Sequence, residues 1–306
     1  MKVNELNLDR WSLELVWDWV ESTNDVALSP AAEHAIVDCR KYLEQRLNDP
    51  SEPTIYGVNT GFGDLAHTRV GSDQLSELQR NLLISHACGV GTDVPEQIVK
   101  SMLLLKIKSL SKGHSGIQLQ TVQRLIDHLN GRIYPVIPSQ GSLGASGDLA
   151  PLAHMVLPLI GEGEVKVDGV SVPASDVLAA KGWTPLKLGA KEGLALINGT
   201  QLMLGYGVMS IKRLERIAYW ADALCAWSLE AWMGRPEPFE ACIHQVRDQV
   251  GAEMVAGNVR QWLEGSEWQK KPRQQVQDPY SFRCTPQVHG ASRNSLYAAR
   301  DVFENE

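Results

Sequence analysis

Between Ile137 and His154 the chain carries a glycine-rich segment whose residue types could do chemistry. Glycines at positions 141, 144 and 147 precede Asp148, a residue type that caps helix N-termini, and Pro151 suits the first turn of a helix. The segment fits a capped loop with a purely structural role, and it also fits a cradle of backbone amides for an anion. A phosphate cradle is the weaker explanation, because the lysine of a phosphate-binding loop is missing and no strand is predicted before the segment.

Self-modification of the chain is the third chemistry that this segment allows. The nitrogen of Gly147 is unhindered, since glycine has no side chain, and it can attack the carbonyl carbon of Ala145 when the loop is compressed into a turn. Loss of water then leaves a ring, and dehydration of Ser146 adds an exocyclic methylidene. Because Ala-Ser-Gly alone is a common tripeptide, the neighbouring residues must decide among the three interpretations.

The residues around the tripeptide resemble a known signature. Residues 141–154, Gly-Ser-Leu-Gly-Ala-Ser-Gly-Asp-Leu-Ala-Pro-Leu-Ala-His, are similar to the signature of the aromatic amino acid ammonia-lyases, which use the prosthetic group 4-methylidene-imidazol-5-one (MIO). Three further segments resemble the same family in the same order: Tyr56–Gly63, Leu196–Gln201 and Gln277–Cys284. By this resemblance the chain is identified as a member of the family, which implies that MIO forms autocatalytically from Ala145, Ser146 and Gly147.

Ser85 and His86, within the segment Leu82–Gly91, resemble the pair found in histidine-specific members of the family. Members specific for phenylalanine or tyrosine carry other residues there. The resemblance therefore implies conversion of L-histidine to trans-urocanate and ammonia, the entry to histidine degradation. Phenylalanine or tyrosine as substrate, and an aminomutase that returns the ammonia to the β-carbon, are alternatives within the family. An alternative of another class is a non-catalytic truncated homologue that folds and binds a partner.

The implied reaction needs a base, because the β-proton that must be removed is only weakly acidic. The amine that is expelled at the same time is a poor leaving group. In the family the MIO group takes the amine as a covalent adduct and so makes it a better leaving group. Tyr56 matches the family's catalytic tyrosine, and a phenolate stabilised by positive charge or hydrogen bonds is basic enough for the task. Tyr280 matches a residue that supports catalysis. Judged without the resemblance, Tyr56 is equally well explained as a packed tyrosine.

Four further residues are predicted to bind the substrate. The planar guanidinium of Arg283 can donate two parallel hydrogen bonds to the substrate carboxylate, and Tyr280 lies three residues earlier, so one helical turn could point both into one pocket. The resemblance places His86 against the substrate imidazole, and the amides of Asn198 and Gln277 beside the MIO ring and the substrate. The structural alternatives are a surface ion pair for Arg283, packing for Asn198 and a structural histidine at 86.

Composition places the chain among globular proteins and excludes several partners. Of its 306 residues 43% are hydrophobic and 21% are charged, and its formal charge of −7 argues against nucleic acid as a partner. Five scattered cysteines encode neither a disulfide framework nor a zinc site, and the histidines lack metal spacing. We therefore expect a cytoplasmic protein without a catalytic metal. The uncharged run 193–211 contains polar residues that would be costly in lipid, so we expect it to be buried in protein and predict no membrane partner.

Helical signals dominate, and they predict a mainly α protein with few strands. Ser29 with Pro30 predicts a helix that runs to Leu47, and Asp93 with Pro95 predicts another that runs to Lys112. Apolar residues at helical spacing predict further helices over 118–129 and 208–233. Alternating residues on both sides of Asp168-Gly169 predict one hairpin, over 164–172.

We expect two domains: an N-terminal domain over residues 1–189 that carries the MIO loop, and the first part of a central helical bundle over residues 190–306. The stripe Leu214, Ile217, Ala221 and Leu224, widened by Trp220 and Trp227, predicts bundle core on the long helix. Family members continue beyond the region that ends here at Glu306, through a bundle that supplies a catalytic acidic residue and holds a homotetramer. The resemblance therefore implies a truncated bundle with an exposed apolar helix face, and it leaves the activity of this chain alone open.

Overall fold

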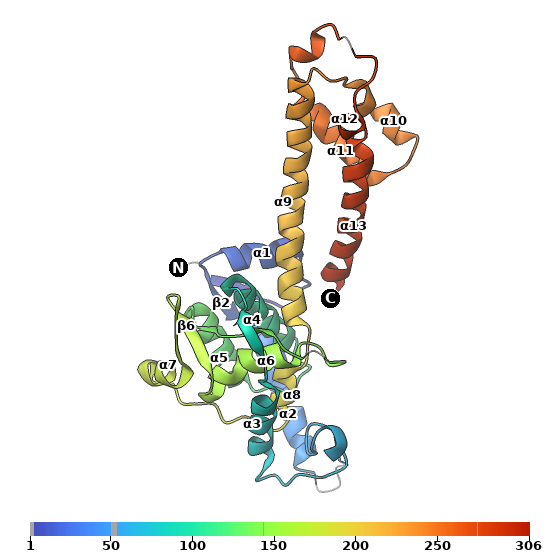
Figure 1. The fold of residues 1–306 in the computed structure, drawn as a ribbon. Coiled ribbons are helices and arrows are strands. Elements are labelled where there is room, and N and C mark those ends of the chain that lie inside the picture. Colours follow the sequence, from blue (N-terminus) through green and yellow to red (C-terminus); the bar gives the residue numbers. More distant parts are fainter. Residues whose placement is uncertain (1–2, 50–53, 143, 274) are drawn as a thin grey trace. The chain divides into compact units, whose positions relative to one another are not determined.

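The computed structural model describes residues 3–49, 54–142, 144–273 and 275–306. Contacts between Cα atoms divide the chain into two compact units, Met1–Gly207 (unit 1) and Val208–Glu306 (unit 2). Helices predominate in both units (Figure 1), which confirms the predicted fold class. Unit 1 contains β1 (Val3–Leu6), α1 (Leu13–Glu21), β2 (Asp25–Leu28), α2 (Pro30–Leu47), the short 3₁₀ helix η1 (Gly63–Leu65), α3 (Leu75–His86), β3 (Val90–Asp93), α4 (Glu96–Ser111), α5 (Leu119–Asn130), β4 (Tyr134–Pro135), β5 (Pro138–Gln140), α6 (Leu149–Val156), η2 (Leu157–Ile160), β6 (Glu164–Val167), β7 (Val170–Pro173), α7 (Ala174–Lys181) and α8 (Glu192–Ile197).

The core of unit 1 is built around α4, most of whose side chains are buried. Helices α1, α2 and α5 pack against it. The apolar stripe predicted on α5 is buried at Val122, Leu125, Ile126 and Leu129, because that face is turned towards the core. The strands form small sheets: β1 pairs with β2 in parallel, β3 pairs with β5 antiparallel, and β4, β6 and β7 form an antiparallel sheet in the order β4-β6-β7.

Two local predictions are confirmed in residue detail. The Ser29 hydroxyl accepts a hydrogen bond from the Ala32 amide at 3.2 Å and so caps α2, which begins at Pro30 as predicted. The predicted hairpin is β6–β7, whose turn places Asp168 at φ +51° and Gly169 at φ +80°. Both values are positive, as the common two-residue hairpin turn requires.

Ser29→Ala is expected to lower the free energy of unfolding by about 1 kcal/mol, because the Ala32 amide loses its cap. Urea denaturation of the variant and the unsubstituted chain measures the difference. An unchanged denaturation midpoint would show that the buried hydroxyl contributes nothing to α2.

Two predictions at the start of elements need correction. Asp93 does not cap the next helix: it ends strand β3, and the residue at the N-cap position of α4 is Pro95. A short strand, β5, lies at the start of the glycine-rich segment and precedes its three glycines, although no strand was predicted there. Its three residues, Pro138–Gln140, lack the apolar alternation that marks a strand, and β5 exists because it pairs with β3.

The division between the two units lies at Gly207–Val208, inside the long helix α9 (Gln201–Ala231), and not near Gly189. The intervening residues belong to unit 1 because of their contacts. Helix α8 packs on α3 and α6. Gly205, in the second turn of α9, lies so close to α4 that an added Cβ would meet Ile98 at 3.4 Å and Met102 at 3.6 Å.

The uncharged run 193–211 is largely buried, as predicted: Leu196, Ile197, Leu204, Val208, Met209 and Ile211 are all core residues. Within the described residues, no helix combines the length and the apolar character that are needed to cross a membrane.

In the part of unit 2 that the structure describes, the regular elements are helices. It contains most of α9, then η3 (Glu237–Phe239), α10 (Ala241–Gln245), α11 (Val250–Trp262), η4 (Trp268–Lys270), α12 (Tyr280–Arg283) and α13 (Thr285–Asn305). Its core cluster is Ala226, Leu229, Phe239, Ala256, Val259 and Leu263. Helices α11 and α13 approach closely, because Gly251 and Gly290 allow backbone contact: a Cβ on Gly251 would lie 2.2 Å from the Gly290 carbonyl oxygen.

The apolar stripe predicted as bundle core on α9 is largely exposed in unit 2. Leu214, Ile217 and Leu224 are exposed, and so are Trp220 and Trp227, whereas the buried face of the helix carries Ala223, Ala226 and Leu229. The exposed rings contact one another at centroid distances of 5.8–6.4 Å through Tyr219, Trp220, Trp227 and Trp262. The prediction that an apolar helix face is exposed is confirmed, while core packing of these tryptophans does not occur within the described residues.

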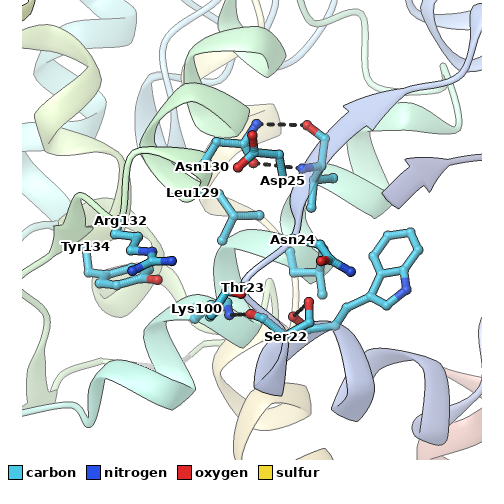
Figure 2. A pocket seen from close by; sticks show the side chains of 12 residues that line it. Ser22, Thr23, Asn24, Asp25, Lys100, Leu129, Asn130, Arg132 and Tyr134 are labelled. Carbon is cyan, nitrogen blue, oxygen red and sulfur yellow. Dashed lines mark hydrogen bonds between the residues drawn. The ribbon is translucent and has the colours of Figure 1, made fainter. Parts of the chain in front are cut away.

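A small cavity in unit 1 lies beside α1, β2 and α5 (Figure 2). The Lys100 ammonium donates to the carbonyls of Val20 and Ser22, both at 2.6 Å, and the Asn130 side chain bonds both backbone groups of Val26. Burial lowers the pKa of Lys100. The volume is about 20 Å³, enough for a water molecule and too small for an amino acid. We therefore assign this cavity a structural role.

Candidate active site

The tripeptide predicted to cyclise lies at the apex of a tight turn between β5 and α6. The Gly144 amide donates to the Gly147 carbonyl and the Gly147 amide donates to the Gly144 carbonyl, both at 3.1 Å. Ala145 and Ser146 are exposed at the apex, and Gly147 is buried. Leu143, which belongs to the family-like signature, lies outside the described residues. The reciprocal hydrogen bonds close residues 144–147 into a tight turn.

Gly199 clamps this turn from a distant part of the chain. Its amide donates to the Ser146 carbonyl at 3.2 Å, and its carbonyl accepts from the Asp148 amide at 2.8 Å. Gly147 has φ +98°, and a Cβ there would lie only 2.0 Å from the Gly199 carbonyl oxygen. Glycine is therefore required at position 147, and it leaves the attacking nitrogen unhindered. The turn thus fits the MIO group that the family resemblance implies.

Asp148 has a role that differs from the predicted one. It occupies the N-cap position of α6, but its side chain caps a different helix. One carboxylate oxygen accepts from the amides of Leu202 and Met203, at 2.9 and 3.1 Å, in the first turn of α9. Asp148 is 1% exposed, so these bonds anchor the start of α9 beside the turn.

Five backbone amides of the glycine-rich segment are already occupied. The amides of Gly144, Gly147, Asp148, Leu149 and Ala150 all donate to backbone carbonyls. An anion cradle needs free amides that point at the ligand, so these groups are not available to a phosphate. These five occupied amides argue against the anion cradle.

His86 is the last residue of α3 and is half-buried. Its Nδ1 lies 2.8 Å from the Leu82 carbonyl oxygen and 3.2 Å from the Ser85 hydroxyl. Because a carbonyl can only accept a hydrogen bond, Nδ1 carries the proton, and Nε2 is left as a hydrogen-bond acceptor. Beyond His86, the Gly89 amide donates to Nε2 of His154 in α6 at 2.9 Å, which ties the end of α3 to the helix that follows the turn.

Tyr56 lies in the loop between α2 and η1, and its ring is 54% exposed. The ring meets Phe62 edge-on, with centroids 6.0 Å apart. The adjacent Gly57 lies against α8, since a Cβ there would be 2.5 Å from Leu194. Tyr56 is therefore not a packed core residue, and its loop is attached to the helix that leads to Asn198.

Asn198 follows directly after α8 and is half-buried. Its carbonyl accepts a hydrogen bond from the Lys106 ammonium at 2.7 Å. The side-chain amide makes no hydrogen bond within the described residues, so it is available to a ligand. Helices α3, α6 and α8 pack against one another, and they position His86, the turn and Asn198 at their ends.

The remaining predicted residues belong to unit 2. Gln277 and Tyr280 are exposed, and Arg283 is half-buried. The Arg283 guanidinium lies over the Tyr280 ring at 4.1 Å, as their three-residue spacing on α12 predicts, and its Nε donates to the Asp278 carbonyl at 3.1 Å. Within the described residues no carboxylate pairs with Arg283, so the surface ion pair considered as its alternative does not form there.

Among the described residues, no group of three or more His, Cys, Asp or Glu side chains is arranged to hold a metal ion. Sequence reasoning missed two residues: Gly199, which bonds to the turn, and Lys106, which bonds to the Asn198 carbonyl. Gly199 sits inside a segment that resembles the family, but its contact with the turn depends on the fold. Lys106 directly follows the apolar run Met102–Leu105 of α4, and this was the signal that the sequence offered.

Residues 11–306 match the aromatic amino acid lyase family, and the chain belongs to this family. Within it, the chain is similar to the histidine ammonia-lyase of Geobacillus thermodenitrificans, with 46% identity over 282 residues, 92% of this chain and 56% of that protein. The family prediction made from the motifs is confirmed. The chain spans about half the length of the curated relatives it matches.

The chain is also similar in fold to solved structures. The histidine ammonia-lyase from Trypanosoma cruzi has a TM-score of 0.88 and 35% identity, over all of this chain and 57% of that one. The tyrosine aminomutase from Streptomyces globisporus has a TM-score of 0.90 and 35% identity, over 99% of this chain and 61% of that one. The fold is therefore that of the MIO-dependent lyases and aminomutases.

Proposed function

We propose that this chain carries the MIO-forming part of a histidine ammonia-lyase active site, and that the assembled enzyme converts L-histidine to trans-urocanate and ammonia. The observation that carries the proposal is the reciprocally hydrogen-bonded turn at residues 144–147, clamped by Gly199. The similarity to histidine ammonia-lyases at up to 47% identity supports histidine over phenylalanine or tyrosine as the substrate.

Ala145, Ser146 and Gly147 would form the MIO group, since the turn is compressed and a Cβ at position 147 has no room. When formed, the group supplies an electrophile that makes the substrate amine a better leaving group. Asn198, whose side-chain amide is free and which lies beside Gly199, would donate to this group or to the substrate. Gln277 is assigned the same kind of contact by its family motif.

The other residues bind the substrate and move its proton. Tyr56 removes the β-proton, and its exposed phenol is reachable by a ligand. The free Nε2 of His86 accepts a hydrogen bond from an N–H of the substrate imidazole. Arg283 binds the substrate carboxylate, and Tyr280, whose ring lies under that guanidinium, orients it.

The proposal also covers the oligomeric state of the enzyme and its cellular compartment. We propose a homotetramer for the whole enzyme, in which the exposed apolar face of α9 is covered. All five cysteines of the chain are free thiols, which supports a reducing compartment such as the cytoplasm.

The test begins with the intact mass of the purified chain and a peptide map across residues 138–154. We expect a deficit of two water molecules, localised to Ala145, Ser146 and Gly147. Production of urocanate from L-histidine is then followed by its ultraviolet absorbance in the assembled enzyme. A chain of full, unmodified mass would remove MIO chemistry from this protein.

Likeness to a tyrosine aminomutase makes a mutase of the same family the second candidate. The two reactions share the electrophile and differ in product. A β-amino acid found by product analysis would identify the mutase, whereas urocanate with free ammonia identifies the lyase.

Arg283→Lys is expected to raise KM for L-histidine about tenfold, with a small effect on kcat. Lysine keeps the positive charge but loses the planar pair of donors, and tenfold in affinity corresponds to about 1.4 kcal/mol. Steady-state kinetics of the assembled variant measures both constants. An unchanged KM would show that the substrate carboxylate binds elsewhere.

A further inference from the structure

Lys106 is a buried amino group to which the proposed reaction gives no part. It lies in the middle of α4, it is 1% exposed, and apolar residues such as Leu103 and Ile107 are buried next to it. Burial lowers the pKa of Lys106 to about 7. An ammonium group placed at such a position is costly unless hydrogen bonds compensate for its lost hydration.

The hydrogen bond of Lys106 connects it to the turn through a single peptide group. Its Nζ donates to the Asn198 carbonyl at 2.7 Å, and within the described residues it has no ion-pair partner. The Asn198 carbonyl belongs to the same peptide group as the Gly199 amide, which donates to the Ser146 carbonyl at 3.2 Å. Peptide groups are planar, so fixing the direction of this carbonyl fixes the direction of the opposed N–H.

Within the described residues, the Asn198 carbonyl accepts a hydrogen bond from Lys106 alone, and the Gly199 amide of the same peptide bonds to the turn itself. Gly199 has φ +142°, a conformation that glycine reaches freely, and it has no side chain that could fix the orientation of this peptide. Asp148 fixes the start of α9 on the other side, through Leu202 and Met203. Lys106 supplies the corresponding anchor before Gly199.

We propose that Lys106 is a positioning residue, whose hydrogen bond to Asn198 orients the Gly199 amide against the turn at residues 144–147 so that the turn can cyclise. The effect on cyclisation rests on the proposed function. The effect on the Gly199 clamp does not rest on it. An experiment can therefore test the clamp and the cyclisation separately.

The experiment compares Lys106→Met with Lys106→Arg, and it uses Lys108→Met as a matched control. Lys108 lies on the same helix and donates to the carbonyls of Asn7 and Asp9, away from the turn. Two quantities are measured: amide hydrogen exchange at Asp148 and Gly199, and the fraction of chains with the two-water mass deficit. The first reports the clamp whether or not MIO forms.

We expect Lys106→Met to speed exchange at Asp148 and Gly199 at least tenfold and to lower the cyclised fraction. Arginine at position 106 restores a cationic donor, so Lys106→Arg is expected to recover most of both quantities. Lys108→Met is expected to change neither. Loss in the methionine variant without recovery in the arginine variant would assign the effect to packing and overturn the proposal.

Two further outcomes are decisive. Unchanged exchange at both amides in Lys106→Met would overturn the positioning role, even if the unsubstituted chain cyclises. Conversely, an unsubstituted chain without the mass deficit would contradict the proposed function. Faster exchange in Lys106→Met would in that case still support the positioning of Gly199 by Lys106. If Lys106→Met does not fold, Lys106→Gln replaces it, and failure of both to fold would show a general core role and overturn the proposal.

Discussion

Tyr56→Phe is expected to lower kcat for L-histidine at least a hundredfold in the assembled enzyme. The substitution removes one oxygen from a ring that is half-exposed and touches Phe62 edge-on, so the loop keeps its packing. Only the proton acceptor is lost. General-base catalysis contributes about 10²–10⁴-fold to a rate, and a hundredfold loss is the lower end of that range.

The measurement is urocanate formation by the variant and by the unsubstituted enzyme at the same enzyme concentration. The mass deficit at residues 145–147 is measured in both samples, because a variant that had not cyclised would be inactive for another reason. Tyr42→Phe is the matched control, since Tyr42 is an exposed tyrosine on α2. Turnover close to the unsubstituted value in Tyr56→Phe would remove Tyr56 as the base.

Local signals in the sequence predict those parts of the fold that neighbouring residues determine. Ser29 and Pro30 set the start of α2 through contacts within one turn, and Asp168-Gly169 sets the β6–β7 hairpin through its own backbone preferences. The apolar spacing over 118–129 predicts α5 for the same reason. These elements require no knowledge of what lies against them.

Contacts between distant segments are what the sequence does not reveal. Asp148 has the residue type of an N-cap and sits at the N-cap position of α6, yet its carboxylate bonds to amides 54 and 55 residues further on. In the same way, Gly199 bonds to the turn and Lys106 bonds to the Asn198 carbonyl across the fold. Burial on α9 shows a further limit, because Trp220 and Trp227 carry a core-like spacing and remain exposed.

The candidate site was predicted mainly from the family motifs. The structure adds physical reasons for some of the residues in these motifs. Glycine at 147 is required by the carbonyl of Gly199, and the tautomer of His86 follows from the carbonyl of Leu82. The stacking of Arg283 on Tyr280 follows from their spacing on α12. For Gln277, which is exposed, the catalytic assignment rests on the motif and stays a prediction.

Asp222→Ala is expected to destabilise unit 2 by about 3–5 kcal/mol. Asp222 lies on α9 and is fully buried. Its carboxylate accepts from Asn258 on α11 at 2.8 Å, from His289 on α13 at 2.9 Å, and from Arg293 on α13. Three helices therefore meet at one carboxylate. Without it the guanidinium of Arg293, which is 7% exposed, would be a buried charge with no counter-charge, and removing one partner of a buried pair typically costs that much.

The same cluster predicts how stability depends on pH. Burial alone would raise the pKa of Asp222, but hydrogen bonds from His289 and Asn258, together with the charge and hydrogen bond of Arg293, lower it overall from 3.8. A carboxyl with a depressed pKa in the folded state contributes stability above its unfolded pKa, and that stability is lost as the pH falls through the folded value. The unsubstituted chain should therefore lose part of its advantage over Asp222→Ala below about pH 3.8.

Urea denaturation followed by tryptophan fluorescence measures both effects, since Trp220, Trp227 and Trp262 all lie in unit 2. Asp301→Ala is the control, because Asp301 is an exposed aspartate on α13 and surface substitutions usually change stability by about 0.5 kcal/mol or less. Equal midpoints for Asp222→Ala and Asp301→Ala at neutral pH would mean that the three helices are held by the Gly251–Gly290 contact and the apolar core. In that case the attraction between the buried charges would only balance the hydration that they lose on burial, as is known for some ion pairs in protein interiors.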